Sequence, residues 1–151
     1  MIELDGMRDE VIKLTLLKLL PHGHPDMGEM PILFFRIRLL DDTWIGNCDL
    51  RLGDSDITEI LGHVGYSIQE EYRGHHYAVH ACQLMCDYAR RANMTHLDIT
   101  CDIDNYPSIR TCERLGAEKI ATIDVPDGFK TYDDTPCCGK KYKYRIDLQQ
   151  K

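Results

Sequence analysis

The feature that most constrains this fold is an apolar run, Gly65 to Ile68, that ends in a basic, glycine-containing turn and leads at once into a helical pattern. The turn contains Arg73 and Gly74, and apolar residues recur at helical spacing from Tyr77 onward. This order places backbone N–H groups at a helix N-terminus, where a phosphate-bearing ligand is favoured. The stretch therefore predicts a strand, a phosphate-binding loop and a helix, and indicates that the ligand is a cofactor.

Alternation of apolar and polar residues predicts strands on both sides of this stretch. The expected strands cover residues 11–20, 32–40, 44–52, 62–68, 97–101, 119–125 and 142–148. A helix stays possible for the first of these, because its second half is largely aliphatic. Asp41-Asp42 predicts a hairpin turn. The segment 53–59 is expected to be a polar loop, and 21–30 and 126–139 to be turn-rich connections.

Two helices are expected. The first starts at Tyr77 and stops at Asn93; the second is capped by Asn105 or Tyr106, with Gly116 just past its end. The chain is thus β-rich at the front and β–α–β–α–β at the back. This order predicts an α/β or α+β fold with a mixed sheet, in a single domain that spans residues 1–151.

Composition excludes several classes of protein. The 151 residues carry a formal net charge of −7, so a nucleic-acid binder is not expected, because neutralising phosphates requires surplus Lys and Arg. No segment has the apolar length needed to span a bilayer, and Met1 to Glu10 lacks the form of a secretory signal. Both observations point to the cytoplasm. The seven Cys, an odd number scattered along the chain, indicate reduced thiols.

Three motifs in order resemble one known family. Gly65-Tyr66-Ser67-Ile68 resembles the fourth strand of a GNAT-type N-acetyltransferase, residues 71–78 (EYRGHHYA) resemble its pyrophosphate loop, and Asn105-x-x-Ser108 resembles the start of the helix after its fifth strand. The likeness covers residues 62–117 well and the first 60 residues only by strand pattern. It is strongest to small bacterial members with Arg-Gly-His-His-Tyr-Ala and Thr-Cys-x-x-x-Asn.

The resemblance implies an acetyl-coenzyme A-dependent transferase that moves an acetyl group to a primary amine of a small molecule or peptide. It implies a single domain with a mixed, mostly antiparallel central sheet of about seven strands flanked by helices, and no metal. The residues that it places at the cofactor are Tyr66, Ser67, Ile68, Arg73, Gly74, His75, His76, Tyr77, Ala78, Asn105 and Ser108.

The sequence departs from the family pattern at three places. His76 replaces the second small residue of the loop, so its side chain must point away from the phosphates unless His75 and His76 add donors to them. Cys112 stands where many members have a tyrosine that protonates the leaving thiolate. Tyr106 and Tyr142 are alternative donors, and the strand of Tyr142 could lie beside the fourth strand. The segment 21–30 is too short for the two helices that form much of the acceptor site, so that site is either open or completed by a second subunit.

Candidates for the base that deprotonates the amine are His63 and Glu59, at or just before the fourth strand. His63 has the better intrinsic pKa, but a structural imidazole bonded to backbone explains it equally well. The thioester carbonyl is expected to be held by main-chain N–H near Ile68. Direct attack is favoured over an acyl-enzyme on Cys112, because no base is evident beside that thiol.

Two other functional classes stay open. A non-catalytic acyl-coenzyme A-binding or regulatory module would keep the loop and lack turnover. A metal or redox protein is disfavoured, because His76-x-x-x-His80 lacks the glutamate of a zincin and no Cys-x-x-Cys occurs. A homodimer is possible through the last strand, which is expected to be exposed.

Overall fold

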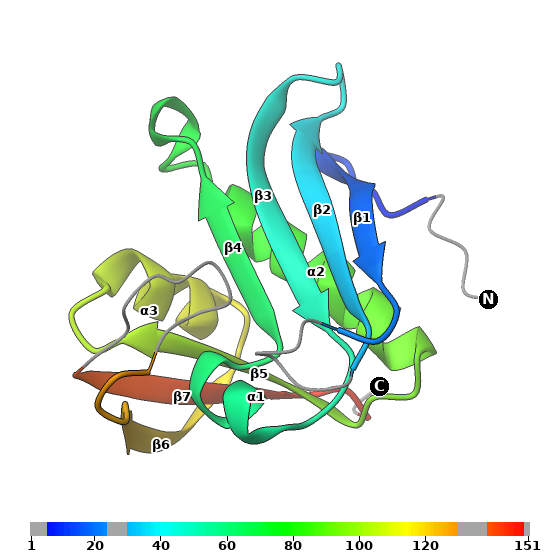
Figure 1. Ribbon diagram of the computed structural model, residues 1–151. Coiled ribbons are helices and arrows are strands. Elements are labelled where there is room, and N and C mark those ends of the chain that lie inside the picture. Colours follow the sequence, from blue (N-terminus) through cyan, green and yellow to red (C-terminus); the bar gives the residue numbers. More distant parts are fainter. Residues whose placement is uncertain (1–5, 24–29, 130–138, 150–151) are drawn as a thin grey trace.

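The computed structural model describes residues 6–23, 30–129 and 139–149, which form two antiparallel sheets and three α-helices (Figure 1). The first sheet has the order β1-β2-β3-β4. Its strands are β1 (Ile12–Leu20), β2 (Ile32–Leu39), β3 (Trp44–Arg51) and β4 (Val64–Ile68). The predicted hairpin of β2 and β3 is confirmed. The segment that could have been a helix is a strand, because its first half buries alternate residues.

The second sheet contains the C-terminal strands in the order β5-β7-β6. These are β5 (His96–Asp102), β6 (Glu118–Asp124) and β7 (Lys140–Asp147). The last strand therefore lies in the middle of its sheet, paired on both sides. Two expectations were wrong: β7 does not lie beside β4, and it is not an exposed edge for a dimer. Alternation within β7 reveals its buried face but not its neighbours.

The two sheets meet where β4 and β5 begin to diverge (Figure 1). At this junction the His63 N–H donates to the Asp98 carbonyl at 2.7 Å, and an isolated bridge joins Gly62 to Ile99. The Thr100 hydroxyl adds a bond of 2.7 Å to the Ile60 carbonyl. Beyond this point β4 pairs only with β3 among the described strands. The side of β4 that faces β5 is therefore left without a ladder.

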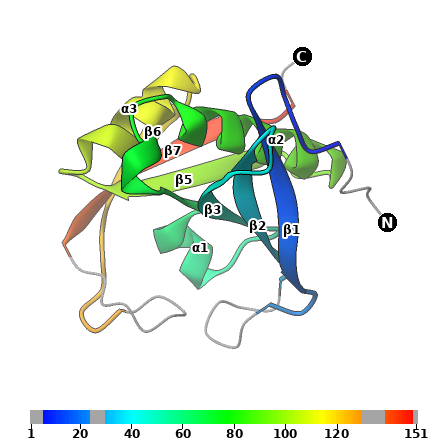
Figure 2. The same ribbon diagram turned by 90° about the horizontal axis from the view of Figure 1, so that it is seen from above.

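Helices cover both faces of the first sheet (Figure 2). The long helix α2 (Tyr77–Arg91) packs on one face, and its Ala81, Leu84 and Met85 belong to a core cluster with residues of both sheets. Burying each large aliphatic side chain stabilises the fold by about 1.5–3 kcal/mol. The helix stops near Asn93, whose φ of 67° is left-handed, as predicted. The third helix, α3 (Tyr106–Arg114), begins at its expected cap, Asn105.

The short helix α1 (Asp56–Leu61) was missed, because 53–59 was expected to be a loop. Ser55 caps it: its Oγ accepts from the N–H groups of Ile57 and Thr58, while Thr58 Oγ1 accepts from the Ser55 N–H. Ile57 and Leu61 then pack beside Ile32 on the face opposite α2. No α-helix is present in the described residues between β1 and β2, and residues 24–29 lie outside the description.

No helix in the described part of the chain is long and apolar enough to cross a membrane.

Candidate functional site

A cavity of about 910 Å³ opens where β4 and β5 separate. Its walls are β4, the loop and first turn of α2 (residues 72–78, apart from residue 75), the end of β5 and one side of α3. The volume lies within the range of sites that bind small molecules and cofactors. The predicted strand, loop and helix thus surround a single hollow.

The register of β4 against β3 decides which backbone groups reach this cavity. The Gln69 N–H donates to the Ile45 carbonyl at 2.8 Å, and the Arg51 N–H to the His63 carbonyl at 2.7 Å. Residues of an antiparallel strand alternate in the direction of these groups, so Gly65 and Ser67 bond to β3. The N–H and C=O groups of the intervening residues face the cavity. These residues are Val64, Tyr66 and Ile68.

The loop before α2 presents further backbone donors. Gly74 has a φ of 89°, and a Cβ at this position would meet no atom within 4 Å. The N-cap residue, His76, has a φ of 63° and makes no capping side-chain bond. The amides of Tyr77 and Ala78 lie in the first helical turn, where no carbonyl of the helix can accept them. Free amides and the positive end of the helix dipole together suit a phosphate group.

The opposite wall is fixed by the start of α3. Asn105 Oδ1 accepts from the Ser108 N–H at 3.3 Å, and the Ser108 hydroxyl lies 2.5 Å from the Tyr66 hydroxyl of β4. Burial raises the pKa of Tyr66 well above its usual range, so this phenol stays neutral. The side-chain bridge therefore joins the two walls across the cavity.

Basic side chains line the cavity although the protein is acidic overall. They are Arg51, Arg73, Arg110, Arg114 and Lys141. Lys141 Nζ lies 2.9 Å from Asp102 Oδ1, which partly neutralises it. Sequence reasoning singled out only Arg73. Arg110 and Arg114 carried a usable signal, because they are one helical turn apart in the helix that Asn105 begins.

The sequence model of the acetyltransferase (GNAT) domain matches residues 23–118. The chain belongs to the GNAT acetyltransferase family. The membership predicted from the three motifs is confirmed at the level of the family. None of the curated protein sequences is significantly similar to the chain.

Solved GNAT structures share the fold. A GNAT family acetyltransferase from Bacillus anthracis is 20% identical, with a TM-score of 0.60 over 78% of this chain and 67% of its own. A ribosomal-protein-S5-alanine acetyltransferase from Vibrio fischeri is 18% identical, with a TM-score of 0.60 over 78% and 62%. The microcin C7 self-immunity acetyltransferase, solved with acetyl-CoA and AMP, is 15% identical, with a TM-score of 0.58 over 77% and 61%. The predicted fold class is confirmed, and the chain spans 61–67% of the length of these structures.

The structure brings together nearly all the residues that the sequence predicted to bind a cofactor. Those that line the cavity are Tyr66, Ser67, Ile68, Arg73, Gly74, His76, Tyr77, Ala78, Asn105 and Ser108. His75 is the exception: its ring lies 5.3 Å from that of Tyr77 and does not form part of the walls. Arg73 turns toward the strand, and its Nε donates to the Ile68 carbonyl at 2.9 Å.

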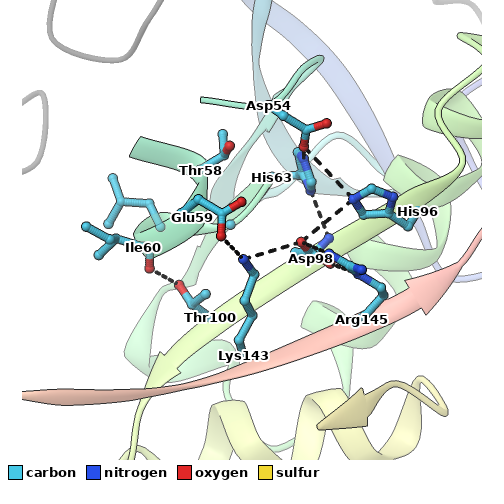
Figure 3. A network of polar contacts seen from close by, with 12 residues as sticks. Asp54, Thr58, Glu59, Ile60, His63, His96, Asp98, Thr100, Lys143 and Arg145 are labelled. Atoms are coloured by element: carbon cyan, nitrogen blue, oxygen red, sulfur yellow. Dashed lines mark hydrogen bonds and ion pairs between the residues drawn. The ribbon is translucent and has the colours of Figure 1, made fainter. Parts of the chain in front are cut away.

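The two base candidates, His63 and Glu59, lie away from the cavity walls, in a polar network at the sheet junction (Figure 3). His63 is 1% exposed, its Nδ1 accepts from the Asp98 N–H at 2.9 Å, and its Nε2 lies 2.8 Å from Asp54 Oδ1. Burial lowers the pKa of His63. This geometry matches the structural imidazole that the sequence left open. The Glu59 carboxylate accepts from Lys143 Nζ at 2.8 Å.

The two acid candidates also lie outside the walls. Cys112 is fully buried, and a hydrogen bond with Cys101 together with burial raises its pKa. The ring of Tyr142 is covered by Lys119 Nζ, 3.8 Å from its centroid. Cys112 is hydrogen-bonded to Cys101, and it is Cys101 rather than Cys112 that lines the cavity.

One group of potential metal ligands occurs among the described residues: Asp54, His63 and His96 have ligand atoms within 4.8 Å of one another. The tautomer of His63 argues against a metal here. Its Nδ1 lone pair accepts the Asp98 amide, so the proton of the neutral ring must sit on Nε2, where it is donated to Asp54. A metal ion at this position would need the lone pair of Nε2, which is not available while Nε2 carries the proton. The group is therefore explained by hydrogen bonding alone.

Proposed function

We propose that this chain is an acetyl-coenzyme A-dependent N-acetyltransferase that moves an acetyl group to a primary amine by direct attack. The observation that carries the proposal is the diverging pair β4 and β5, with unpaired backbone groups of β4 facing the cavity. The pantetheine arm of the cofactor is an extended chain with two amide groups. It can pair with these backbone groups as an added strand does.

The phosphates would lie at the start of α2. The open space at Gly74 and the amides of Tyr77 and Ala78 suit the diphosphate. Arg73 can add charge-assisted bonds, because its Nε alone is engaged by the Ile68 carbonyl. Arg110 and Arg114 supply further positive charge for a phosphate on the α3 side. The solved acetyltransferase with bound acetyl-CoA supports the choice of ligand.

The thioester carbonyl would be polarised by an outward N–H of β4 near Ile68. The amine would attack the carbonyl carbon directly, because Cys112 is buried outside the cavity walls with a raised pKa. The acceptor is proposed to be a small-molecule or peptide amine, and the site of action the cytoplasm. Membership of the small bacterial subgroup with the Arg-Gly-His-His-Tyr-Ala loop is part of the same proposal.

A second candidate is a non-catalytic acyl-coenzyme A-binding module. It is favoured by the position of the predicted acid and base residues, which all lie outside the cavity walls. Release of free thiol from acetyl-coenzyme A in the presence of a panel of amines and peptides separates the two functions. Release that depends on the amine supports the transferase, whereas binding without release supports the module.

Cofactor binding is tested by calorimetric titration with acetyl-coenzyme A. Gly74→Trp should abolish binding without changing the circular dichroism, because the new side chain fills the phosphate space. Gly128→Trp is the matched control: it has a similar φ of 78°, open surroundings and a place outside the cavity walls. The proposal is contradicted if the wild type gives no heat of binding with acetyl-coenzyme A at micromolar concentrations. It is also contradicted if Gly74→Trp binds acetyl-coenzyme A with the affinity of the wild type.

A further inference from the structure

Two charged side chains on β3 point to the face of the first sheet that α2 does not cover. Cys48 and Leu50 belong to the core cluster beneath α2, so the alternating residues Asp49 and Arg51 face the other way. Both are nine-tenths buried, with 8% and 5% of their surfaces exposed. They therefore form a built polar site rather than a solvated surface pair.

This pair lies beside β4, the strand that forms one wall of the cavity. Asp49 is paired with Gly65 of β4, and the position of a Cβ at Gly65 would be 2.6 Å from Asp49 Oδ1 and 3.2 Å from Arg51 Nη2. The carboxylate thus occupies the space that any side chain at residue 65 would fill. Both Gly65 and Arg51 line the cavity. Asp49 itself is not a wall residue, but only Gly65, which has no side chain, lies between its carboxylate and the cavity.

The pair has hydrogen-bonding capacity left over. Arg51 Nη1 donates to the Leu61 and Gly62 carbonyls at 3.0 and 2.8 Å, and Nη2 lies 3.0 Å from Asp49 Oδ2. Asp49 Oδ2 is therefore ion-paired with Arg51, whereas Arg51 Nε has no hydrogen-bond partner among the described residues. An ionised carboxylate offers about four acceptor positions on its two oxygens. The ion pair leaves some of these positions available to a ligand that donates hydrogen bonds.

We propose that Asp49 binds the ammonium group of the acceptor and takes up its proton, an inference that rests on the proposed acetyl transfer. The phosphates of the cofactor are assigned to the α2 side, so the amine must approach from the opposite face, where Asp49 lies. Asp49 is level with Gly65, one residue from Tyr66. The inference therefore places the thioester carbonyl at the Tyr66 N–H, nearer to Asp49 than the Ile68 N–H.

The chemistry balances without another reagent. The ammonium gives one proton to the Asp49 carboxylate and becomes a neutral amine, whose lone pair forms the new C–N bond. The C–S bond breaks, the electron pair leaves on the thiolate, and a second proton from nitrogen neutralises the thiolate. Asp49 then returns its proton to water. The residues paired directly with Asp49, Phe34 on β2 and Gly65 on β4, carry no charge. Arg51, two residues along β3, is the charged group in contact with Asp49, and Arg36 of β2, on the same face of the sheet, lies over the Trp44 ring.

The acid strength of this carboxyl group suits the role. Burial raises the pKa of Asp49, and Arg51 reduces the rise without cancelling it. A carboxylate with a raised pKa is a better proton acceptor near neutral pH than an exposed one. Arg51, which ties the carboxylate to the turn before β4, acts as a positioning residue.

A titration of the wild-type protein tests the binding step without any turnover. The Asp side-chain carboxyl signals are followed by ¹³C NMR while propylamine is added as its ammonium salt at neutral pH. The Asp49 signal should shift and saturate, while the exposed Asp124, paired with Lys140, stays unchanged. A signal from Asp49 that does not move, or that moves no more than that of Asp124, overturns the inference.

The proton-transfer step is tested by thiol release from acetyl-coenzyme A with propylamine. Asp49→Asn should lower kcat/KM by about 100-fold or more and remove the acidic limb of its pH profile, with acetyl-coenzyme A affinity retained. Asp124→Asn is the matched control and should keep the wild-type rate. A rate in folded Asp49→Asn equal to wild type overturns the inference. Absence of turnover in the wild type counts against the proposed function alone, because the NMR titration still decides whether Asp49 binds an ammonium group.

Discussion

At the scale of single residues, His76 combines a position in the cavity wall with backbone strain. Its φ of 63° lies in the left-handed region, which costs a non-glycine residue about 1 kcal/mol. His76→Gly is therefore expected to raise the free energy of unfolding, by up to about 1 kcal/mol. His75 has no positive φ, so His75→Gly relieves no strain and should lower the free energy of unfolding, because glycine loses more conformational entropy on folding. Urea denaturation measures both, and a destabilised His76→Gly would show that the imidazole makes compensating contacts.

Cys101 is expected to be the most reactive thiol among the described cysteines. Hydrogen bonds from the Cys112 thiol and the Ser108 hydroxyl lower its pKa, and it lines the cavity. The pKa of Cys112, by contrast, is raised by its bond with Cys101 and by burial, and that of Cys82 by burial. Thiolates rather than thiols react with alkylating agents.

Iodoacetamide should therefore modify Cys101 first, and acetyl-coenzyme A should slow the reaction because it fills the same cavity. Peptide mass spectrometry at successive times measures the rate at each cysteine. Equal rates at Cys101 and Cys82, or a Cys101 rate that acetyl-coenzyme A leaves unchanged, would contradict the assignment of this thiol to the cavity wall.

At the scale of elements, β4 should show an alternating pattern of hydrogen exchange. The amides of Gly65 and Ser67 are directed at β3, whereas those of Tyr66 and Ile68 face the cavity. In the free protein the first two should exchange slowly and the other two quickly. Acetyl-coenzyme A should slow only Tyr66 and Ile68, because pantetheine pairs with the open side of the strand. NMR-detected exchange with and without cofactor measures this, and uniform protection along β4 would refute the added-strand geometry.

The elements differ in how fully their sequences specify them. β4, α2 and α3 were predictable, because strand alternation and helical spacing are local signals, and Asn93 and Gly116 mark the ends of the two helices. The helix α1 was not, because its cap pairs Ser55 with Thr58 instead of the more usual Glu or Gln. Its six residues also give too short a pattern to distinguish from a loop.

The site divides in the same way. The loop residues 73–78 are neighbours in sequence and were recognised together. Asp49 reaches Gly65 only through the pairing of β3 with β4, and no pattern inside either strand encodes that register. His63 was chosen for its intrinsic pKa, but the approach of β5 supplies the amide that occupies its Nδ1. Contacts between distant segments therefore account for what the sequence left undetermined.

At the scale of the whole molecule, the two sheets are held together at the junction around His63 (Figure 3). The cavity begins beyond this junction, where β4 and β5 separate. Asp98 is central to it: burial alone would raise its pKa, but the hydrogen bonds and charge of Arg145, with His63 and His96, lower it on balance. Stability from Asp98 is present above its unfolded pKa of about 3.9 and is lost below it. It therefore stays constant between pH 7.5 and 5.5.

His63 behaves differently within that window. Its pKa is lowered in the folded protein, mainly by burial, while Asp54 and Asp98 act to raise it and His96 to lower it. The unfolded chain therefore takes up the proton first as pH falls below about 6.5, and folding stability declines. His63→Gln should be less stable than wild type at pH 7.5 by about 1–3 kcal/mol, because it loses the bond to the buried Asp98 amide.

The same variant should lose less stability than wild type between pH 7.5 and pH 5.5. Urea denaturation at both values measures the change, with His22→Gln, at an exposed position, as the matched control that should follow wild type. An equal pH dependence in wild type and His63→Gln would mean that His63 is protonated in the folded state, and the tautomer that disfavours a metal with Asp54 and His96 would then be wrong. A shallower dependence would show that the sheet junction is closed by a neutral imidazole, as the geometry of the Asp98 amide requires.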